Sequence, residues 1–128
     1  MAESVNLAEK FAKFQDTWSP RLIAELNGQL VKLAKLDGEL VWHAHDDEDE
    51  LFLLIEGSLT IQMRPDPARP ERIEEVDLKQ GELFVVPKGV EHNPIAKPTA
   101  SVMLFEPAAT KHTGAVAHER TAYEQPWI

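Results

Sequence analysis

Between residues 20 and 106, short apolar segments alternate with turn-forming residues, and this pattern sets the fold class. Glycine, proline or asparagine interrupts the chain at intervals of roughly ten residues, a spacing typical of sandwiches and barrels of short strands. Within these segments apolar and polar side chains alternate, as they do in a strand with one buried face. The sequence therefore predicts an all-β domain with strands at 21–26, 29–36, 39–45, 51–55, 59–64, 73–78, 83–86 and 101–106.

Several short motifs mark the expected breaks between these strands. Asn27-Gly28 and Asp37-Gly38 combine residues that tolerate positive φ, so each predicts a hairpin. Gly57-Ser58 predicts a further turn, and the prolines within residues 65–70 predict a loop because proline has no place in a sheet centre. Each of these motifs is expected to end one strand and begin the next.

One short amphipathic helix is expected before the strands, over residues 6–15. Leu7, Phe11 and Phe14 recur at helical spacing, and Asn6 stands where an N-cap is expected. The apolar stripe of this helix needs a partner, and we expect that partner to be the outside of the sheet.

The length of 128 residues is typical of one domain with its own core. Within the tail, His112 and His118 are expected to be surface residues, and Trp127 is a candidate anchor. We divide the single domain 1–128 into a helical segment over 1–19, a barrel over 20–106 and an irregular tail over 107–128.

Composition excludes several classes of function. The chain has no cysteine, which excludes disulfides, thiolate metal sites and cysteine nucleophiles. Its net charge of −9 argues against nucleic acid as a partner, because phosphates favour a basic surface. No continuous apolar run has the length of a signal peptide or a membrane span, so a cytoplasmic protein without membrane contact is expected.

Two histidines and a nearby glutamate are placed to share one ligand. His43 and His45 are two residues apart on an expected strand, so their side chains project from the same face. Glu50 would lie on the opposite face of an unbroken strand, but the acidic run Asp46–Asp49 predicts a turn or bulge that resets the alternation. Together with His92 these residues give three imidazoles and a carboxylate, which suit iron, manganese, cobalt, nickel, copper or zinc better than calcium or magnesium.

Other conspicuous residues near this motif have plainer interpretations. Asp46–Asp49 is interpreted as a solvated turn, because it lacks the spaced acidic residues and the glycine of a calcium loop. Trp42 faces away from the two histidines by strand alternation and is expected in the core. Phe52 shares the face of Glu50 and is expected in a pocket.

The spacing of these residues resembles the two sequence signatures of the cupins, a family of small jelly-roll barrels. The first signature is Gly, five residues, His-x-His, three or four residues, Glu, six residues, Gly. His43 to Gly57 matches it from the first histidine onward, although Gly38 precedes His43 by four residues. The second is Gly, five residues, Pro-x-Gly, two residues, His, three residues, Asn. Gly81 to His92 matches it, but Ala96 stands in place of the final Asn.

The resemblance implies a cupin jelly-roll β-barrel with a short N-terminal α-helix. It also implies that His43, His45, Glu50 and His92 bind one divalent transition metal ion, which we expect to be zinc, iron, manganese or nickel. Within the family the chain is most similar to small single-domain cupins labelled mannose-6-phosphate-isomerase-like. Such cupins commonly form dimers, and the apolar outer face of segment 51–55 needs cover, so a homodimer is expected.

Three functions fit these residues. A metal-dependent enzyme would bind a small oxygenated molecule, such as a sugar, hydroxy-carbonyl or enolate, at the three-His, one-Glu centre. It would isomerise that molecule or, with Fe(II), act as a dioxygenase. A non-catalytic barrel would only bind a metal or a small molecule, and a structural barrel would bind neither. The sequence indicates no general base outside the ligand set.

Overall fold

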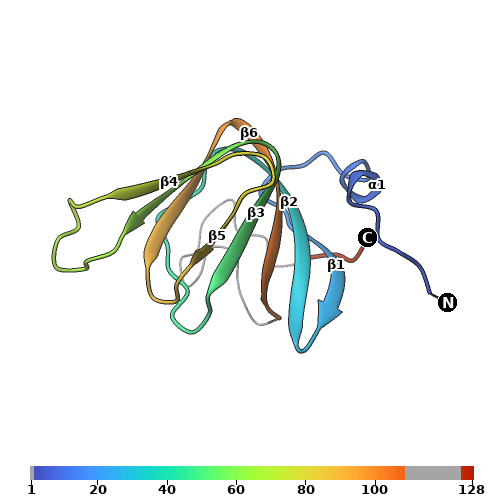
Figure 1. Ribbon diagram of the computed structural model, residues 1–128, viewed down its shortest axis with the longest axis horizontal. Helices are drawn as coiled ribbons and strands as arrows, with labels where there is room; N and C mark the ends of the chain where they lie inside the picture. Colours follow the sequence, from blue (N-terminus) through green and yellow to red (C-terminus); the bar gives the residue numbers. More distant parts are fainter. Residues whose placement is uncertain (1, 109–124) are drawn as a thin grey trace.

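The computed structural model describes residues 2–108 and 125–128, which form a curled β-sheet with one short helix (Figure 1). The strands pair antiparallel in the order β1-β2-β6-β3-β4, and β5 also pairs with β3. This arrangement confirms the predicted all-β fold. Within the described residues, no helix is long and apolar enough to cross a membrane. The elements are α1 (Leu7–Phe11), β1 (Arg21–Leu26), β2 (Gln29–Glu39), β3 (Glu50–Arg64), β4 (Glu74–Leu78), β5 (Leu83–Val86) and β6 (Glu91–Pro107).

Two long strands, β3 and β6, run through the whole sheet and make it curl. The first part of β3 pairs with the last part of β6, and the last part of β3 pairs with the first part of β6. Between these stretches the register shifts at Leu54/Glu56 and at Gly57/Leu59. Because a bulge bends a strand and increases its twist, the two halves of the sheet enclose a common lumen, the predicted jelly-roll barrel (Figure 1).

Two of the predicted turns are wrong, because the glycines concerned lie inside strands. Gly38 (φ 62°) lies in β2 beside a register shift, and Gly57 (φ 95°) lies in β3 beside another. A glycine at positive φ permits a bulge as readily as a turn, and the local sequence does not distinguish the two. Asn27-Gly28, in contrast, forms the predicted hairpin between β1 and β2, with both residues at positive φ.

The predicted strand over 39–45 is also wrong. Beyond Glu39, which ends β2, the segment makes an isolated bridge between His43 and His92 rather than a ladder. Conversely, β6 is far longer than the predicted strand over 101–106. Its prolines obscure the strand in the sequence, because proline is rare inside strands.

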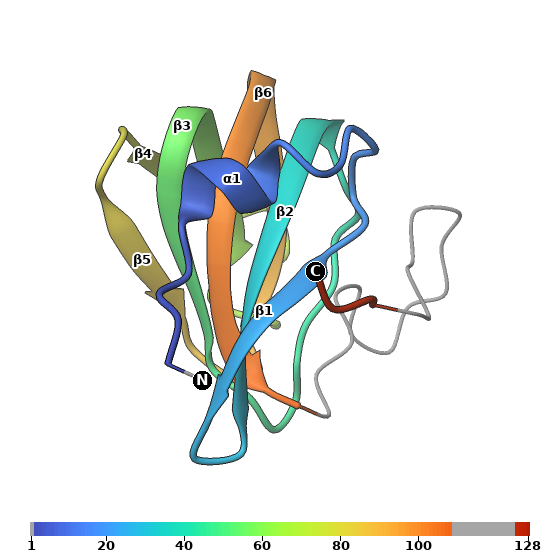
Figure 2. The same cartoon turned by 90° about the vertical axis from the view of Figure 1, so that its right-hand side faces the viewer.

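Helix α1 begins where predicted but is shorter. The Asn6 side chain accepts a hydrogen bond from Glu9 N at 3.0 Å, and the helix ends at Phe11 rather than at residue 15. Figure 2 shows the helix lying across the outer face of the sheet, as predicted. The buried residues of this outer cluster are Phe11, Phe14, Ile23 and Leu33.

Alternation along the strands divides the side chains between this outer cluster and the lumen. In β2, Ala34 and Leu36 point into the lumen, while Leu33 packs outside under α1. The lumen is therefore lined by alternate residues of several strands, and its apolar part forms the main core. The buried residues of that core are Trp18, Ala34, Leu36, Leu40, Phe52, Leu54, Leu59, Ile61, Met63, Leu78, Val86, Ala96, Ala100, Val102 and Leu104.

Residues 125–128 lie beside β1 and are held through their backbone. Leu22 N donates a hydrogen bond to Pro126 O at 2.9 Å, and Ile128 N donates one to Leu22 O at 3.2 Å. The Trp127 side chain, the candidate anchor, is 56% exposed. The backbone rather than the indole therefore fixes this end of the chain.

We expect Gly57→Ala to destabilise the barrel more than Gly28→Ala. Both glycines have positive φ, so alanine at either position adopts a left-handed conformation that costs about 1–2 kcal/mol. At Gly57 the new Cβ would also overlap with the Thr99 carbonyl oxygen, whereas at Gly28 no described atom lies within 4 Å. Urea unfolding should show the larger loss of stability for Gly57→Ala, and equal losses would contradict this close approach of β3 to β6.

Candidate metal centre

Backbone hydrogen bonds join the two histidine-bearing segments. His43 N donates to His92 O at 3.0 Å, and His92 N donates to His43 O at 2.8 Å. Gly89 N also donates to His45 O at 2.8 Å. The connection between β2 and β3 is therefore held against the start of β6, although it is not itself a strand.

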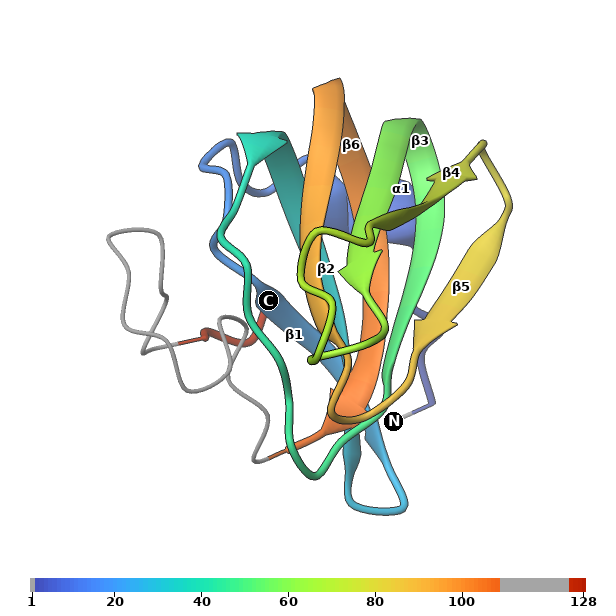
Figure 3. The ribbon, with the colours of Figure 1, turned by 90° about the vertical axis from the view of Figure 1, so that its left-hand side faces the viewer.

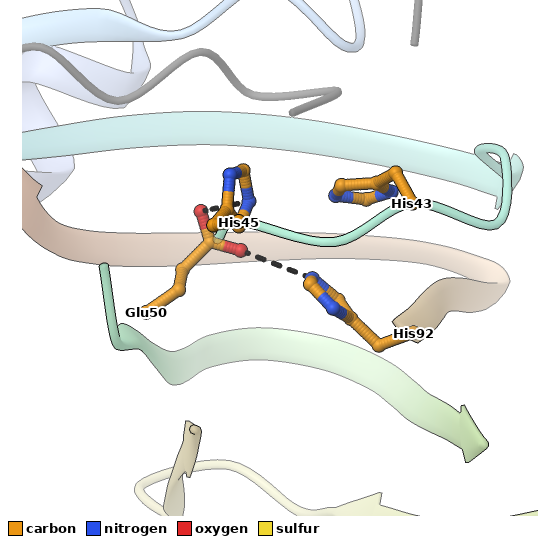
Figure 4. A group of neighbouring side chains, drawn as sticks. All are labelled: His43, His45, Glu50 and His92. Atoms are coloured by element: carbon orange, nitrogen blue, oxygen red, sulfur yellow. Dashed lines mark ion pairs between the residues drawn. The ribbon is translucent and has the colours of Figure 1, made fainter. Parts of the chain in front are cut away.

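The structure brings the four predicted ligands together inside the lumen. His43, His45, Glu50 and His92 each offer one ligand atom, and these atoms all lie within 4.8 Å of one another. Their side chains converge from the β2–β3 connection, the start of β3 and the start of β6 (Figure 4). Each residue is at most 4% exposed, so the group could hold a metal ion that is shielded from bulk water.

Backbone carbonyls fix the tautomer of two of the imidazoles. His43 Nδ1 lies 2.7 Å from Val41 O, and His92 Nδ1 lies 2.9 Å from Val90 O. A carbonyl oxygen only accepts, so Nδ1–H is the donor and Nε2 carries the lone pair. Within the described residues, no hydrogen-bond partner reaches the buried Nε2 atoms of His43, His45 and His92. A bound ion would satisfy all three, which is the usual arrangement of ligating histidines.

Glu50 completes the group at distances that suit ligands of one ion. Its Oε2 lies 3.4 Å from His45 Nε2, and its Oε1 lies 3.5 Å from His92 Nε2. These distances exceed the usual length of a hydrogen bond. Two ligands that are each about 2.1 Å from one ion lie roughly 3.0–3.4 Å apart, so the spacing fits a shared ion. Nitrogen and oxygen donors in this ratio fit zinc, iron, manganese or nickel.

Burial and neighbouring charges shift the pKa values of these residues. Burial, together with the charge of His92, lowers the pKa of His43 from 6.5 to about 4. Burial alone would raise the pKa of Glu50, but Glu106 and the nearby histidines outweigh it and hold that pKa well below its usual range. For His45, burial lowers the pKa and the Glu50 carboxylate raises it, with a net upward shift. Near neutral pH, His43 is thus neutral and Glu50 ionised, the forms that coordinate a cation.

Two further polar residues of the lumen were missed by the sequence analysis. Lys32 Nζ lies 2.9 Å from Glu106 Oε1, and their side chains are 1% and 0% exposed. Burial and the neighbouring Glu50 carboxylate raise the pKa of Glu106 well above its usual range. Strand alternation could have indicated that both residues face the lumen. Lys32 lies on the same face of β2 as Ala34, and Glu106 lies on the same face of β6 as Leu104.

A small cavity of about 20 Å³ adjoins the cluster, a volume that holds about one water molecule. Phe52 lines it, which confirms the prediction that this residue faces a pocket. Trp18 and Leu40 line it as well, and the polar part of the lining comes from His43 and Glu50. The cavity is thus an apolar space directly beside the candidate ligands.

Other predictions near the site had mixed outcomes. Trp42 is half-buried outside the core, and the Arg64 guanidinium lies 3.9 Å from its ring centroid. The prediction that Trp42 lies in the core is therefore wrong: the two buried histidines face the lumen, and Trp42, directly before His43, faces the other side. Asp46–Asp49 forms the predicted turn, mostly exposed and outside the four-residue group. His112 and His118 lie outside the described residues.

Comparison with known proteins establishes the family. A family model described as Cupin domain matches residues 29–107, well over half of the chain. The chain belongs to the cupin family. This cupin is similar to the uncharacterized protein YdbB of Bacillus subtilis (strain 168), with 35% identity over 92 residues that cover 72% of this chain and 69% of that protein.

Solved structures share the fold of this cupin. A cupin-2 domain containing protein from Shewanella frigidimarina NCIMB 400 is 45% identical, with a TM-score of 0.73, covering 80% of this chain and 93% of that one. Hydroquinone 1,2-dioxygenase from Sphingomonas sp. TTNP3, solved with 4-hydroxybenzoate bound, is 16% identical, with a TM-score of 0.71, covering 84% of this chain and 32% of that one. The second likeness shows a shared fold alone. The finer likeness to mannose-6-phosphate isomerases stays a prediction.

We expect the metal-free cupin to lose stability as the pH falls from 6.5 towards 4, partly through His43. The unfolded chain has the ordinary histidine pKa of 6.5, whereas the folded value is about 4, so the unfolded state binds the extra proton in this interval. A shift of this size contributes up to about 3 kcal/mol. The free energy of unfolding is measured with urea at about pH 7 and at about pH 4.5. Its decrease between the two pH values should be smaller for His43→Gln than for the unchanged protein. Equal losses would show that His43 does not titrate in this way.

Proposed function

We propose that this cupin binds one divalent transition metal ion through His43, His45, Glu50 and His92, and that it acts on a small oxygenated molecule at that ion. One observation carries the proposal: within the described residues, three buried Nε2 atoms face the Glu50 carboxylate without hydrogen-bond partners. Such atoms would destabilise a purely structural barrel, because each buried polar group without a hydrogen-bond partner costs free energy.

The protein's own residues would bind and orient the substrate beside the ion. When bound, zinc, manganese, nickel or iron supplies a Lewis acid that polarises an oxygen, and iron can also supply chemistry with dioxygen. His43 and Glu50 line the cavity and also belong to the ligand group. The cavity has room for about one water-sized group, so the part of a substrate that enters it would lie next to the proposed ion, in a space that excludes bulk water.

The lining of the cavity favours a ligand that presents a small apolar group there over a sugar. Trp18 donates its Nε1–H to Asp37 O at 2.9 Å, so its ring offers the cavity apolar surface rather than a donor. Phe52 and Leu40 are apolar as well. A sugar would bury several hydroxyl groups against these side chains, at a cost of about 1–3 kcal/mol for each group left unpaired. We therefore favour a hydroxy-carbonyl compound or an enolate, whose few oxygens can reach the ion.

Fe(II)-dependent dioxygenation is the second candidate, and the size of the cavity favours it. A volume of about 20 Å³ suits a molecule no larger than water or dioxygen, and an apolar lining suits dioxygen better than water. Hydroquinone 1,2-dioxygenase shares the fold, but its 16% identity gives no support at the level of chemistry. The alternative to both enzymes is a barrel that binds the metal or a small molecule without converting it.

We expect the purified protein, without a histidine tag, to contain about one equivalent of a transition metal. His92→Ala removes one imidazole and should abolish the bound metal. Glu50→Gln keeps the shape of the side chain but removes its charge, and it should weaken metal binding about 10-fold or more. Glu56→Gln makes the same change at an exposed position of the same strand and should have no effect. Elemental analysis of the four proteins measures the outcome.

The same samples separate the alternatives. Absence of metal from the unchanged protein, with added metals failing to bind, would overturn the proposal. Iron together with oxygen uptake on addition of enolate-type or phenolic compounds would favour dioxygenation. Tight binding of such compounds to the metal-loaded protein, without any conversion, would indicate the non-catalytic barrel.

We also infer that a second copy of the chain covers an apolar patch on the outer face of the barrel. β5 pairs with β3 in the register Leu51↔Val85 and Leu53↔Leu83, so these four side chains share one face. Figure 3 shows β5 at the edge of the sheet beside β3. Leu83 is 56% exposed and Val85 is 41% exposed. A contiguous apolar patch of this kind is typical of a protein interface.

Leu83→Lys is expected to convert the dimer into a monomer, because it places a charge within the patch. Ile73→Lys is the matched control, since Ile73 is 44% exposed and lies outside β5 and β3. Sedimentation equilibrium or light scattering on a sizing column measures the mass. An unchanged protein that is monomeric at high concentration would contradict the inference.

A further inference from the structure

One large aromatic side chain enters the lumen from outside the sheet. Trp18 lies in the connection between α1 and β1, which Figure 2 shows passing the end of β2, and it is 3% exposed within the main core. Its side chain lines the cavity that His43 and Glu50 also line. Trp18 therefore stands beside the proposed metal site without belonging to a strand of the barrel.

Two hydrogen bonds to β2 fix this side chain in place. Trp18 N donates to Lys35 O at 2.8 Å, and the indole Nε1–H donates to Asp37 O at 2.9 Å. The Lys35 ammonium also donates to Phe14 O at 2.6 Å, so the connection is attached to the same strand at a second point. The residue is thus held both at its backbone and at the polar edge of its ring, and the ring can leave the cavity only by breaking the contact with Asp37.

The backbone at Trp18 adopts a conformation that disfavours a large side chain. Within the described residues, Trp18 (φ 56°) and Asn27 (φ 51°) are the non-glycine residues with positive φ. Asn27 belongs to the hairpin between β1 and β2, where asparagine is favoured, whereas a bulky residue in the left-handed region is a rare outlier. Such strain is concentrated at ligand sites, where the surrounding structure enforces it. An indole kept at an unfavourable backbone position points to a role of the ring in the cavity.

The indole is the largest side chain in the cavity lining, so it limits the space beside the candidate ligands. The other apolar lining residues are aliphatic, apart from Phe52. With Trp18 in place, the cavity of about 20 Å³ has room for about one water-sized group. Removal of a large buried side chain leaves a void, because the surrounding structure collapses only in part. An apolar void of about 150 Å³ stays dry and accepts benzene, so the space of the indole would accept an aromatic ring.

We propose that Trp18 is a specificity-determining residue, which restricts the group beside the proposed ion to about the size of a methyl group. The inference rests on the proposed function and deepens it, because it assigns the size limit of the substrate to one side chain. A substrate that directs a small substituent into the cavity fits beside the ion. The indole excludes one that directs an aromatic ring there.

The test compares Trp18→Gly with the unchanged protein. Glycine removes the ring and suits the positive φ at this position. Leu78→Ala is the matched control, because it also makes a void in the main core, but at a residue outside the cavity lining. Each protein is loaded with Co(II), and its visible spectrum is recorded during titration with lactate or mandelate. These probes are both 2-hydroxy acids with one carboxylate, and they differ only in carrying a methyl or a phenyl group.

We expect the unchanged protein to bind lactate about 10-fold or more tightly than mandelate, because a phenyl group overpacks the cavity. In Trp18→Gly this preference should fall by about 10-fold or more, since the phenyl group gains an apolar space. Leu78→Ala should keep the preference of the unchanged protein. Equal binding of the two acids by the unchanged protein, or an unchanged preference in Trp18→Gly, would overturn the inference.

Indole tests the enlarged cavity without a metal. In Trp18→Gly it can occupy the space of the missing ring and donate its N–H to Asp37 O, so it should raise the thermal unfolding temperature of the metal-free variant. The unchanged protein and Leu78→Ala should not respond. Failure of the unchanged protein to bind Co(II) would overturn the proposed function, whereas no response of Trp18→Gly to indole would overturn this inference alone.

Trp18→Phe keeps the inference testable if Trp18→Gly does not fold. Phenylalanine is smaller than tryptophan but leaves an aromatic ring in the core. The preference for lactate over mandelate should therefore fall in the same direction, by about threefold. A preference in Trp18→Phe that equals or exceeds that of the unchanged protein would contradict a size limit set by the indole.

Discussion

The two backbone hydrogen bonds between His43 and His92 are the contact on which the site depends. They attach an irregular connection to the start of β6 and so bring candidate ligands from separate sequence motifs into one place. Both imidazoles are held in the same way, by the backbone carbonyl two residues earlier. His43 Nδ1 lies within hydrogen-bonding distance of Val41 O, and His92 Nδ1 lies within hydrogen-bonding distance of Val90 O. The backbone therefore fixes the position of the two imidazoles and also the nitrogen that each one directs into the lumen.

The curl of the sheet gives the lumen two chemically different regions. Bulges near Gly57 let β3 and β6 take part in both halves of the barrel, so a residue far along either strand still faces the same interior. The starts of β3 and β6 bring Glu50 and His92 into this interior, and the end of β6 adds Glu106. The remaining lumen positions are largely apolar. The polar region is small enough for each of its residues to lie in contact with another, which limits the cost of burying it.

The spacing of the candidate ligands predicted which side chains cluster better than local patterns predicted the strands. His43 and His45 lie outside any strand, yet both point into the lumen, because alternate residues of an extended segment share a side even without a ladder. The sequence could not distinguish a bulge from a turn at Gly57, since both conformations need only a glycine at positive φ. Strand alternation places Lys32 and Glu106 on the lumen face, but it does not show that the two meet, because only the pairing of β2 with β6 brings them within 2.9 Å of each other.

The charge of the proposed metal site would limit what binds beside an ion there. Glu50 contributes one negative charge and neutral imidazoles contribute none, so a divalent ion in this group would keep a net charge of roughly +1. In an apolar lumen that charge favours a ligand bearing a compensating negative charge, because bulk water is not available to solvate it. An enolate or an ionised hydroxy-carbonyl compound would provide that charge at the oxygen next to the proposed metal, and a neutral sugar would not. Electrostatics and the apolar surface of Trp18 and Phe52 therefore favour the same class of ligand on independent grounds.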